Sequence, residues 1–371
     1  MTLPNSFSII VLYHSGKSHL KVCLDSLIKT TRKEDEIIVV VNNIDEKEHI
    51  VDFYKEQVKY VHFYENLGHG KAGNTGVEMA TNDYVIIADH DLIFLPNWLE
   101  NLWSFYASDS NLRAVSCKII DVLNKNILDF GIASSEYNFA HPHLGLPLNH
   151  PLVQNNRYAQ MICTGGFLIH KTDFLEINGF NTEFGTLYTD LDICLRLKEK
   201  GYTVGAAAKA IAYHFGSELA QNTLSYKRSH LKADVKGVFM KNNAAIIEND
   251  LIHYYKDSFL HFASSYISQK EFFFCNCMTV INYLWFEEVL KNLGVKSLGS
   301  IHHVFPSRDT RQIDLFGIWG YNIMALGSPV AYFVDIFASI RNNAYWWQER
   351  VNKNDIVIDR NANILSIKDI I

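Results

Sequence analysis

The chain has 371 residues, of which 48% are hydrophobic and 20% charged, so it is long and apolar enough to form about two globular domains. Its 34 lysines and arginines against 40 aspartates and glutamates give a net charge of -6, which disfavours a nucleic-acid partner bound through phosphate neutralisation. The six cysteines are scattered among apolar residues, as expected of reduced thiols. With neither a secretory leader nor a bilayer-length apolar segment in view, we expect a cytoplasmic protein.

Strand-like and helical patterns alternate in the first part of the chain. Strands are predicted at Ser8 to Tyr13, Glu36 to Val41, Tyr60 to Tyr64 and Tyr84 to Ala88, and helices at Ser18 to Lys29 and Ala72 to Ala80. This alternation predicts an α/β fold with a mostly parallel sheet sandwiched by helices. Ligands of such folds bind at the carboxyl ends of the strands, where Asp89 and Asp91 follow the fourth predicted strand.

A long loop interrupts the middle of the chain. Further strands are predicted at Ala114 to Ile120, Phe167 to His170 and Val204 to Tyr213, and a helix at Thr189 to Lys200 with Thr189 as its N-cap. The polar stretch from Ser134 to Arg157 has the length of a binding loop or lid. Its histidines at 141, 143 and 150 lack the regular spacing of a metal site, and we expect them to be solvated.

The residue composition and patterning of the sequence change after residue 217. We predict two domains, an α/β domain over residues 1–217 and a mainly α domain over residues 218–371. Ser328 and Pro329 are typical of a helix start, and Val330 to Ile340 is apolar on nearly all sides. Because this helix is too short to span a bilayer, three alternatives stay open: burial within its own domain, a homo-oligomer interface, or peripheral contact with the inner face of a membrane.

Several short motifs follow one another in a defined order. They are Ser8 to Leu27, Asn66 to Gly76, Asp83 with Tyr84, Asp89 to Asp91, Gly165 with Gly166, Gly179 to Phe184, Tyr188 to Arg196, and His214. In order and spacing they resemble the motifs of family 2 glycosyltransferases, which are inverting enzymes with the GT-A fold. The resemblance covers a little more than half the chain. It implies transfer of a sugar from a nucleotide-diphosphate donor to a glycan, lipid-linked or protein acceptor, as in polysaccharide biosynthesis.

The resemblance also implies roles for individual residues. Mn²⁺ or Mg²⁺, which prefers hard oxygen ligands and substrate phosphates, would be held by Asp91 and His214. Asp190 would be the catalytic base that removes the proton of the acceptor hydroxyl. The donor would contact Asn42, Asn66, Gly68, Lys71, Asn74, Asp83 and Asp89. The acceptor would contact Thr164, Gly165 and Gly166, where small residues leave room for a sugar, together with the loop from Asp129 to Arg157.

Two positions depart from the family pattern. Thr189 stands where the family normally has Glu, and Val41, Asn42 and Asn43 stand where it commonly has an Asp that reads the nucleobase, so Asn42 or Asn43 would have to bind the base. These departures keep a non-catalytic glycan-binding or scaffold protein on a degenerate fold open as an alternative. A nucleotidyltransferase is a second alternative, although it would need more cations around its triphosphate than Lys71 alone.

Overall fold

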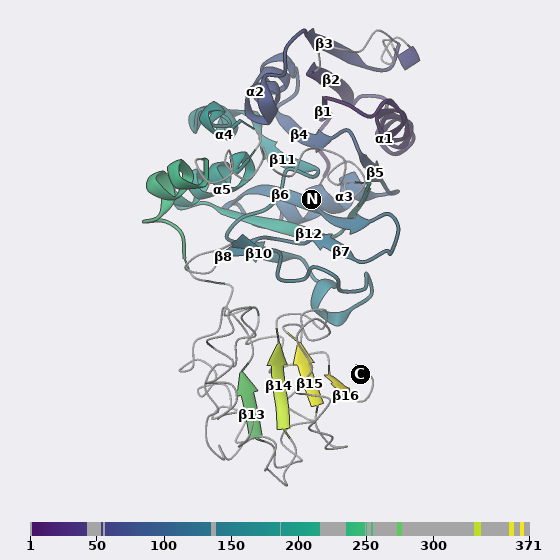
Figure 1. Cartoon of the computed structure of the whole chain (residues 1–371). Coiled ribbons are helices and arrows are strands. Elements are labelled where there is room, and N and C mark those ends of the chain that lie inside the picture. The colour runs from purple at the N-terminus through teal and green to yellow at the C-terminus, as the bar shows by residue number, and fades with distance from the viewer. Residues whose placement is uncertain are drawn as a thin grey trace. The chain divides into compact units, whose positions relative to one another are not determined.

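The computed structural model describes most of the first two thirds of the chain and short segments of the rest. The described residues are 2–42, 53–54, 56–134, 139–185, 187–215, 235–248, 250, 254, 273–276, 330–334, 356–359 and 364–366. Internal contacts divide the chain into two compact units, Met1–Asn249 and Asp250–Ile371. Figure 1 labels most helices and strands of both units, and each unit is considered by itself below.

A ten-stranded sheet forms the centre of the first unit (Figure 1). Its main path runs in the order β10-β12-β6-β11-β4-β1-β2-β3, while β5 pairs with β12 and β7 with β6. The strands are β1 (Ser8–Tyr13), β2 (Glu36–Asn42), β3 (Lys59–Phe63), β4 (Tyr84–Asp89), β5 (Leu92–Phe94), β6 (Leu112–Asp121), β7 (Ile127–Asp129), β10 (Arg157–Ala159), β11 (Phe167–His170) and β12 (Thr203–His214). Pairing is parallel throughout β3-β2-β1-β4 and between β6 and β12, and β11 is antiparallel to both β4 and β6.

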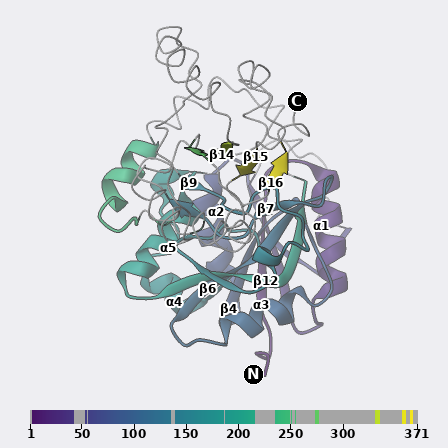
Figure 2. The same ribbon diagram turned by 90° about the horizontal axis from the view of Figure 1, so that it is seen from below.

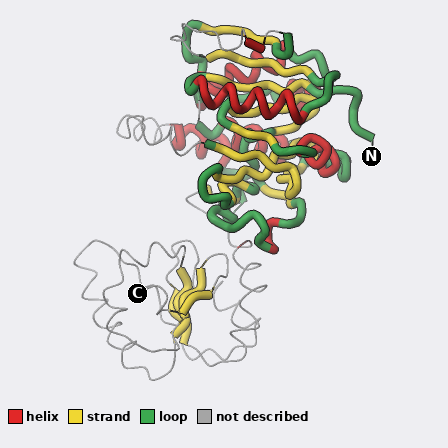
Figure 3. Tube along the Cα trace, turned by 90° about the vertical axis from the view of Figure 1, so that its right-hand side faces the viewer, coloured by secondary structure: helices red, strands yellow, loops and turns green. Residues whose placement is uncertain are grey.

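Helices cover both faces of this sheet because side chains alternate along its strands. Ile10 and Leu12 of β1 join one buried cluster, whereas Ile9 and Val11 join the other. The first cluster packs against α2 (Gly68–Met79), α4 (Lys171–Glu176) and α5 (Thr189–Glu199), and the second against α1 (Lys17–Thr30) and α3 (Trp98–Tyr106). Figure 2 shows α1 on one side of the sheet and α4 and α5 on the other, and Figure 3 shows the strands stacked one beside the next. This is the sandwiched α/β architecture predicted from the sequence.

The structure corrects two helix starts. α2 begins at Gly68 rather than Ala72, so the turn between β3 and α2 is tighter than the sequence pattern indicated. The N-cap of α5 is Tyr188, which has a left-handed φ of 62°, and Thr189 is the first helical residue. The long loop before β11 contains the short pair β8 (Ala133–Ser134) and β9 (Phe139–Ala140) and the 3-10 turn η2 (Pro151–Val153).

The second unit holds a four-stranded sheet in the order β13-β14-β15-β16. Its strands are β13 (Phe273–Asn276), β14 (Val330–Val334), β15 (Ile356–Asp359) and β16 (Ile364–Ser366). The helix predicted from Val330 is therefore wrong over 330–334, because this apolar run is a strand that pairs in parallel with both β13 and β15. The remainder of that predicted helix and most of the predicted mainly α domain lie outside the described residues.

The boundary between the units falls later than residue 217. Residues 235–243 form a helix whose Phe239 is fully buried among aromatic rings of the first unit. Asn243 reaches Asp192 of α5, at 3.5 Å from Nδ2 to Oδ1. Residues 235–248 therefore belong to the first unit, and the compact boundary lies at 249. Within the described part of the chain, no helix is both long and apolar enough to cross a bilayer.

Candidate active site

A cavity of about 220 Å³ opens at the carboxyl ends of β1, β2 and β4. It is lined by Leu12, Tyr13, His14, Asn42, Asn66, His69, Ala72 and Asp89. The three strands are parallel neighbours in register, so their last residues meet at one edge of the sheet. Of the donor contacts predicted from the sequence, Asn42, Asn66 and Asp89 line this cavity, and Asn43 lies outside the described residues.

The turn that leads into α2 is fixed by Asn42. The Asn42 Oδ1 atom accepts a hydrogen bond of 2.7 Å from the Leu67 amide, and its Nδ2 atom faces Asn66 Oδ1 at 3.2 Å and the Gly68 carbonyl at 3.3 Å. Gly68 has φ of +77°, and a Cβ atom there would meet the backbone of Gly185 at 3.1 Å. Glycine is thus required where two loops touch, and most of the hydrogen-bonding capacity of Asn42 holds that turn.

His69 lies between the donor cavity and the residues predicted to contact the acceptor. Its Nε2 atom is 3.7 Å from Asp89 Oδ1 and 3.3 Å from Thr164 Oγ1, and its Nδ1 atom is 3.3 Å from Thr189 Oγ1. Burial lowers the pKa of His69, but the hydrogen bond and charge of Asp89 and the charge of Asp190 outweigh it, and the net pKa is raised. A single imidazole therefore contacts three elements of the site.

The pKa of Asp89 is lowered, whereas burial alone would raise the pKa of an acid. Burial raises it, but the hydrogen bond from His69 and the charges of His69, His214 and His90 lower it to about 2. The Asp89 side chain keeps 37% of its surface exposed, so solvent and a ligand can reach it. Asp89 is consequently a fixed negative charge at the rim of the cavity across the neutral range.

Asp91 and His214 come together through the pairing of β5 with β12, which sets Leu92 opposite His214. The Asp91 Oδ2 atom lies 3.3 Å from His214 Nε2, and the Asp91 carbonyl accepts a hydrogen bond from Phe215 N. Burial lowers the pKa of His214, whereas the hydrogen bond and charge of Asp91, with smaller effects of Asp89 and Asp121, raise it overall. The structure thus places the two predicted metal ligands side by side.

This pair fits a hard divalent cation only in part. Among the described residues, no group of three or more His, Cys, Asp and Glu side chains is arranged to hold a metal ion by itself. One carboxylate oxygen and one imidazole nitrogen are nevertheless the kind of incomplete donor set that Mn²⁺ or Mg²⁺ uses when substrate phosphates and water supply the remaining ligands. Asp91 and His214 are therefore suited to an ion that arrives with a diphosphate.

Asp190 lies at the start of α5, next to Thr189, whose hydroxyl contacts His69. Burial raises the pKa of Asp190, and nearby Asp129 adds to this, against the opposing effects of His69 and of the backbone amides of Leu191 and Asp190 itself. The Leu191 amide donates to Asp190 Oδ1 at 3.0 Å. Asp190 thus combines a partly buried carboxylate with a stronger affinity for protons than an ordinary Asp, which is what a general base needs.

Three predicted donor contacts lie away from the cavity. Asp83 precedes β4, so it lies at the opposite end of that strand, about 20 Å from Asp89 at 3.3 Å per residue. Lys71 is exposed on α2, and the side-chain amide of Asn74 is engaged at both ends by the backbone of Phe180. The geometry therefore disfavours Asp83 as a nucleotide contact and makes Asn74 a clamp between α2 and the loop before α5.

The two glycines predicted to leave room for an acceptor are required by packing. A Cβ atom on Gly165 would lie 2.7 Å from Ile119 Cδ1, and one on Gly166, where φ is +71°, would lie 2.7 Å from Cys117 Sγ. Both contacts point into the core beneath the site. These glycines therefore let the chain carrying Thr164 approach β6 closely.

The loop histidines have separate partners. His141 Nδ1 is 2.7 Å from Asp129 Oδ1, His143 contacts Arg157, and His150 Nδ1 accepts from the Leu152 amide. The prediction that they are solvated is wrong for His143, which is only 2% exposed.

Sequence reasoning missed His69, His14 and the buried His90. His14 lines the cavity, and its ring lies edge-on to His90 with 4.9 Å between centroids. The only signal for His69 was an imidazole side chain among the glycines of the motif from Asn66 to Gly76.

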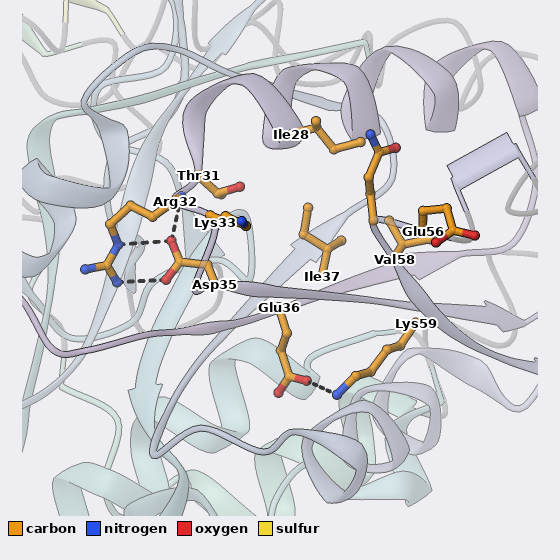
Figure 4. Close-up of a pocket in the computed structure, with 11 residues that line it drawn as sticks. Ile28, Thr31, Arg32, Lys33, Asp35, Glu36, Ile37, Glu56, Val58 and Lys59 are labelled. Atoms are coloured by element: carbon orange, nitrogen blue, oxygen red, sulfur yellow. Dashed lines mark hydrogen bonds and ion pairs between the residues drawn. The ribbon is translucent and has the colours of Figure 1, made fainter.

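A larger cavity of about 690 Å³ lies at the other end of β2, lined by residues of α1, β2 and β3 and of the turns between them. Figure 4 shows its charged side chains facing one another. Arg32 contacts Asp35 at 2.7 Å and Lys59 contacts Glu36 at 2.6 Å. Because these charges are mutually compensated and the cavity is remote from the carboxyl ends of the strands, its size does not make it the active site.

Comparison with known proteins finds similarity over the segment that contains the residues lining the cavity. Residues 8–130 match the family model described as Glycosyl transferase family 2. The uncharacterized glycosyltransferases MJ1057 of Methanocaldococcus jannaschii and YibD of Escherichia coli are 28% and 29% identical over 30% and 32% of this chain. The matches span 40% and 35% of those two relatives, so this chain covers less than half of their length.

Longer but weaker similarity extends further along the chain. An uncharacterized glycosyltransferase of Haemophilus influenzae is 23% identical over 61% of this chain and 71% of its own length. Among solved structures, GalNAc-T7 with UDP, GalNAc and Mn²⁺ superposes over 56% of this chain and 43% of its own, with a TM-score of 0.47 and 16% identity. A mannosyltransferase of Pyrobaculum calidifontis with GDP-Man and Mn²⁺ superposes over 56% of this chain and 56% of its own, with a TM-score of 0.42 and 17% identity. The similarity of this chain to glycosyl transferase family 2 is therefore carried by residues 8–130.

Proposed function

We propose that this chain is an inverting glycosyltransferase that uses Mn²⁺ or Mg²⁺ and moves a sugar from a nucleoside-diphosphate donor to the hydroxyl of a glycan, lipid-linked or protein acceptor. The observation that carries the proposal is the arrangement around His69. Asp89 of β4 and Asp190 of α5, which are far apart in sequence, both act on this one ring at the mouth of the cavity. An acid of β4 and an acid of α5 thus both act on the charge of one ring.

The donor end of the site is supported by the cavity and by the pair behind it. The cavity lies where ligands of parallel α/β sheets bind, and Asp89 at its rim can orient a ribose hydroxyl. Asp91 and His214 are suited to hold the cation. When bound, that cation neutralises the negative charge that develops on the departing diphosphate.

The acceptor end is supported by the environment of Asp190. In the proposed step the acceptor oxygen forms a bond to the anomeric carbon while the bond from that carbon to the diphosphate oxygen breaks, and the diphosphate leaves with the electron pair. The acceptor proton passes to the Asp190 carboxylate. Because this is one displacement from the face opposite the leaving group, the anomeric configuration inverts without a covalent sugar intermediate.

The alternatives have less support. A nucleotidyltransferase must compensate a triphosphate, yet the described residues that line the cavity include no Lys or Arg. A scaffold protein would have no use for two acids with oppositely shifted pKa values around one ring, an arrangement typical of acid–base chemistry.

Asp190→Asn tests the proposal. Wild type is incubated with Mn²⁺ and UDP-glucose, UDP-N-acetylglucosamine or GDP-mannose together with candidate acceptors, and nucleoside diphosphate release is measured. We expect Asp190→Asn to lower the rate about 10²- to 10⁴-fold, the usual contribution of a general base, with nucleotide binding retained. Asp109→Asn, which changes an exposed turn carboxylate, is the matched control. Undiminished transfer by Asp190→Asn would show that Asp190 is not the catalytic base.

A further inference from the structure

Tyr188 adopts a backbone conformation that residues with a side chain rarely adopt. Its φ of 62° lies in the left-handed region, and it is the one aromatic residue among the described non-glycine residues with a positive φ, the others being Asn97, Lys125 and Asn178. A left-handed conformation brings the Cβ atom close to the following carbonyl oxygen, so it persists only where the surrounding structure holds it. The contacts of Tyr188 must therefore compensate this cost.

Aromatic rings from two other segments hold the ring of Tyr188. It stacks on Phe239 of the helix formed by residues 235–243, with 4.9 Å between ring centroids and 20° between the planes, and it meets Phe139 of β9 at 6.0 Å. Phe239 is fully buried and also contacts the rings of Phe139 and Phe184. Because Phe239 is fixed by this packing, the Tyr188 ring stacked on it is fixed as well.

The left-handed turn at Tyr188 sets the direction in which the chain enters α5. The Tyr188 carbonyl accepts a hydrogen bond of 2.9 Å from the Asp192 amide, and Thr189 and Asp190 are the first two residues of the helix. Thr189 is 2% exposed, and its hydroxyl lies 3.3 Å from His69 Nδ1. A different φ at residue 188 would move Thr189 away from His69 and would move Asp190 with it.

We propose that Tyr188 is a positioning residue for the proposed base, and that the ring of Phe239 keeps it in the left-handed conformation that this role requires. The proposal rests on the function proposed above for Asp190, and it assigns neither ring a contact with the reacting atoms. It makes turnover dependent on residues 235–243, which lie beyond the segment that the family model matches. The backbone conformation at residue 188, rather than the bulk of its side chain, is the feature that turnover needs.

The first test compares two replacements that both remove the ring. Glycine adopts a positive φ readily, whereas alanine keeps the Cβ atom that opposes it. Urea unfolding of the full-length protein should therefore show Tyr188→Gly to be at least as stable as Tyr188→Ala. Inside α3, at the exposed Ser104, the same two replacements should give the usual helical order, with alanine the more stable. Greater stability of Tyr188→Ala than of Tyr188→Gly would overturn the proposal.

The second test measures nucleoside diphosphate release with Mn²⁺ and whichever of UDP-glucose, UDP-N-acetylglucosamine and GDP-mannose wild type uses. We expect the kcat of Tyr188→Ala to fall about tenfold, the population factor that corresponds to the cost of a left-handed alanine. The kcat of Tyr188→Gly should stay within about threefold of wild type, because glycine carries no such cost. Both variants should keep the nucleotide affinity of wild type. An equal loss of kcat in the two variants would contradict the role assigned to the backbone.

Phe239→Leu tests the partner ring, since leucine keeps an apolar side chain but cannot stack. We expect its kcat to fall about tenfold with nucleotide affinity retained, and the double variant with Tyr188→Gly to recover most of this loss, because glycine needs no stacking partner. Phe105→Leu, at a buried position of α3 in the other core cluster, is the control and should keep its kcat. A double variant no faster than Phe239→Leu would overturn the link between the two rings. Full activity of Asp190→Asn would instead contradict the proposed base.

Discussion

Two aspartates of the site have the same side chain and opposite shifts in pKa. Burial raises the pKa of each, but Asp89 is held by the hydrogen bond and charge of His69, which lower its pKa to about 2, whereas burial prevails at Asp190. Asp89 therefore stays charged through the neutral range, and Asp190 binds a proton more readily. Two carboxylates with separated pKa values are suited to separate tasks, one as a fixed charge and the other as the proposed proton acceptor.

A substitution at Asp83 tests the geometry against the family resemblance. The resemblance made Asp83 a donor contact, but the structure places it at the amino end of β4, where its carbonyl accepts from the Lys171 amide at 2.7 Å. We expect Asp83→Asn to leave nucleotide affinity and turnover within about twofold of wild type, since residue 83 lies about 20 Å from Asp89 along β4. A tenfold loss of nucleotide affinity would show that residue 83 reaches the donor after all.

At the scale of elements, Glu36 ties the start of β2 to its neighbours. Its carboxylate accepts hydrogen bonds from Ser8 of β1, from Lys59 of β3, and from both the N–H and the hydroxyl of Thr81 after α2. Burial raises the pKa of Glu36, but these hydrogen bonds lower it to about 2. Because the folded state has the lower pKa, its stabilising effect is present above the unfolded value near 4.5 and disappears as the pH falls toward 2.

Glu36→Gln should therefore destabilise the protein in a pH-dependent way. The side chain is 12% exposed, and a shift of this size corresponds to at most about 3 kcal/mol at pH 7. Urea unfolding of wild type and variant at pH 7 and pH 3 measures the difference, which should be smaller at pH 3. The exposed Glu34→Gln is the matched control. A difference that does not change with pH would contradict the assigned hydrogen bonds.

The main strands of the sheet were predictable because they are long apolar runs. Runs such as Ser8 to Tyr13 and Tyr84 to Ala88 have strong local preferences, and their alternation with helices favours parallel pairing. β5 could not be found, since a strand of three residues is stabilised mainly by its pairing with β12. Val330–Val334 was misassigned because a short apolar run suits a buried strand as well as a buried helix.

The candidate site was predictable only where a motif marks the end of a strand. The roles of Asp89, Asp91, Asp190 and His214 were predicted from the family resemblance, whose motifs here follow strands or begin a helix. His69 was not, because its partner Thr189 is 120 positions away and no local pattern encodes that contact. Nor could the sequence show that the side chains of Asn42 and Asn74 are engaged by the chain's own backbone.

At the scale of the molecule, residues 235–248 complete the first unit. Phe239 stacks on Tyr188 with 4.9 Å between ring centroids and also meets Phe139 and Phe184, and Lys198 pairs with Glu248 at 2.8 Å. A chain ended after residue 217 should be less stable to urea than one ended after residue 249 by about 3–5 kcal/mol, the usual cost of deleting a buried Phe. Equal stability of the two truncated chains would indicate that the first unit ends at residue 217.

In the proposed function, Asp91 and His214 belong to a site for a cation and a diphosphate beside the cavity. Calorimetric titration of UDP and of GDP into the full-length protein, with Mn²⁺ and with EDTA in its place, measures whether such a site exists. We predict that one nucleotide binds wild type only with Mn²⁺ and that Asp91→Asn loses this binding, while Asp109→Asn keeps it. Equal binding by wild type and Asp91→Asn, or binding indifferent to Mn²⁺, would show that Asp91 holds no such cation.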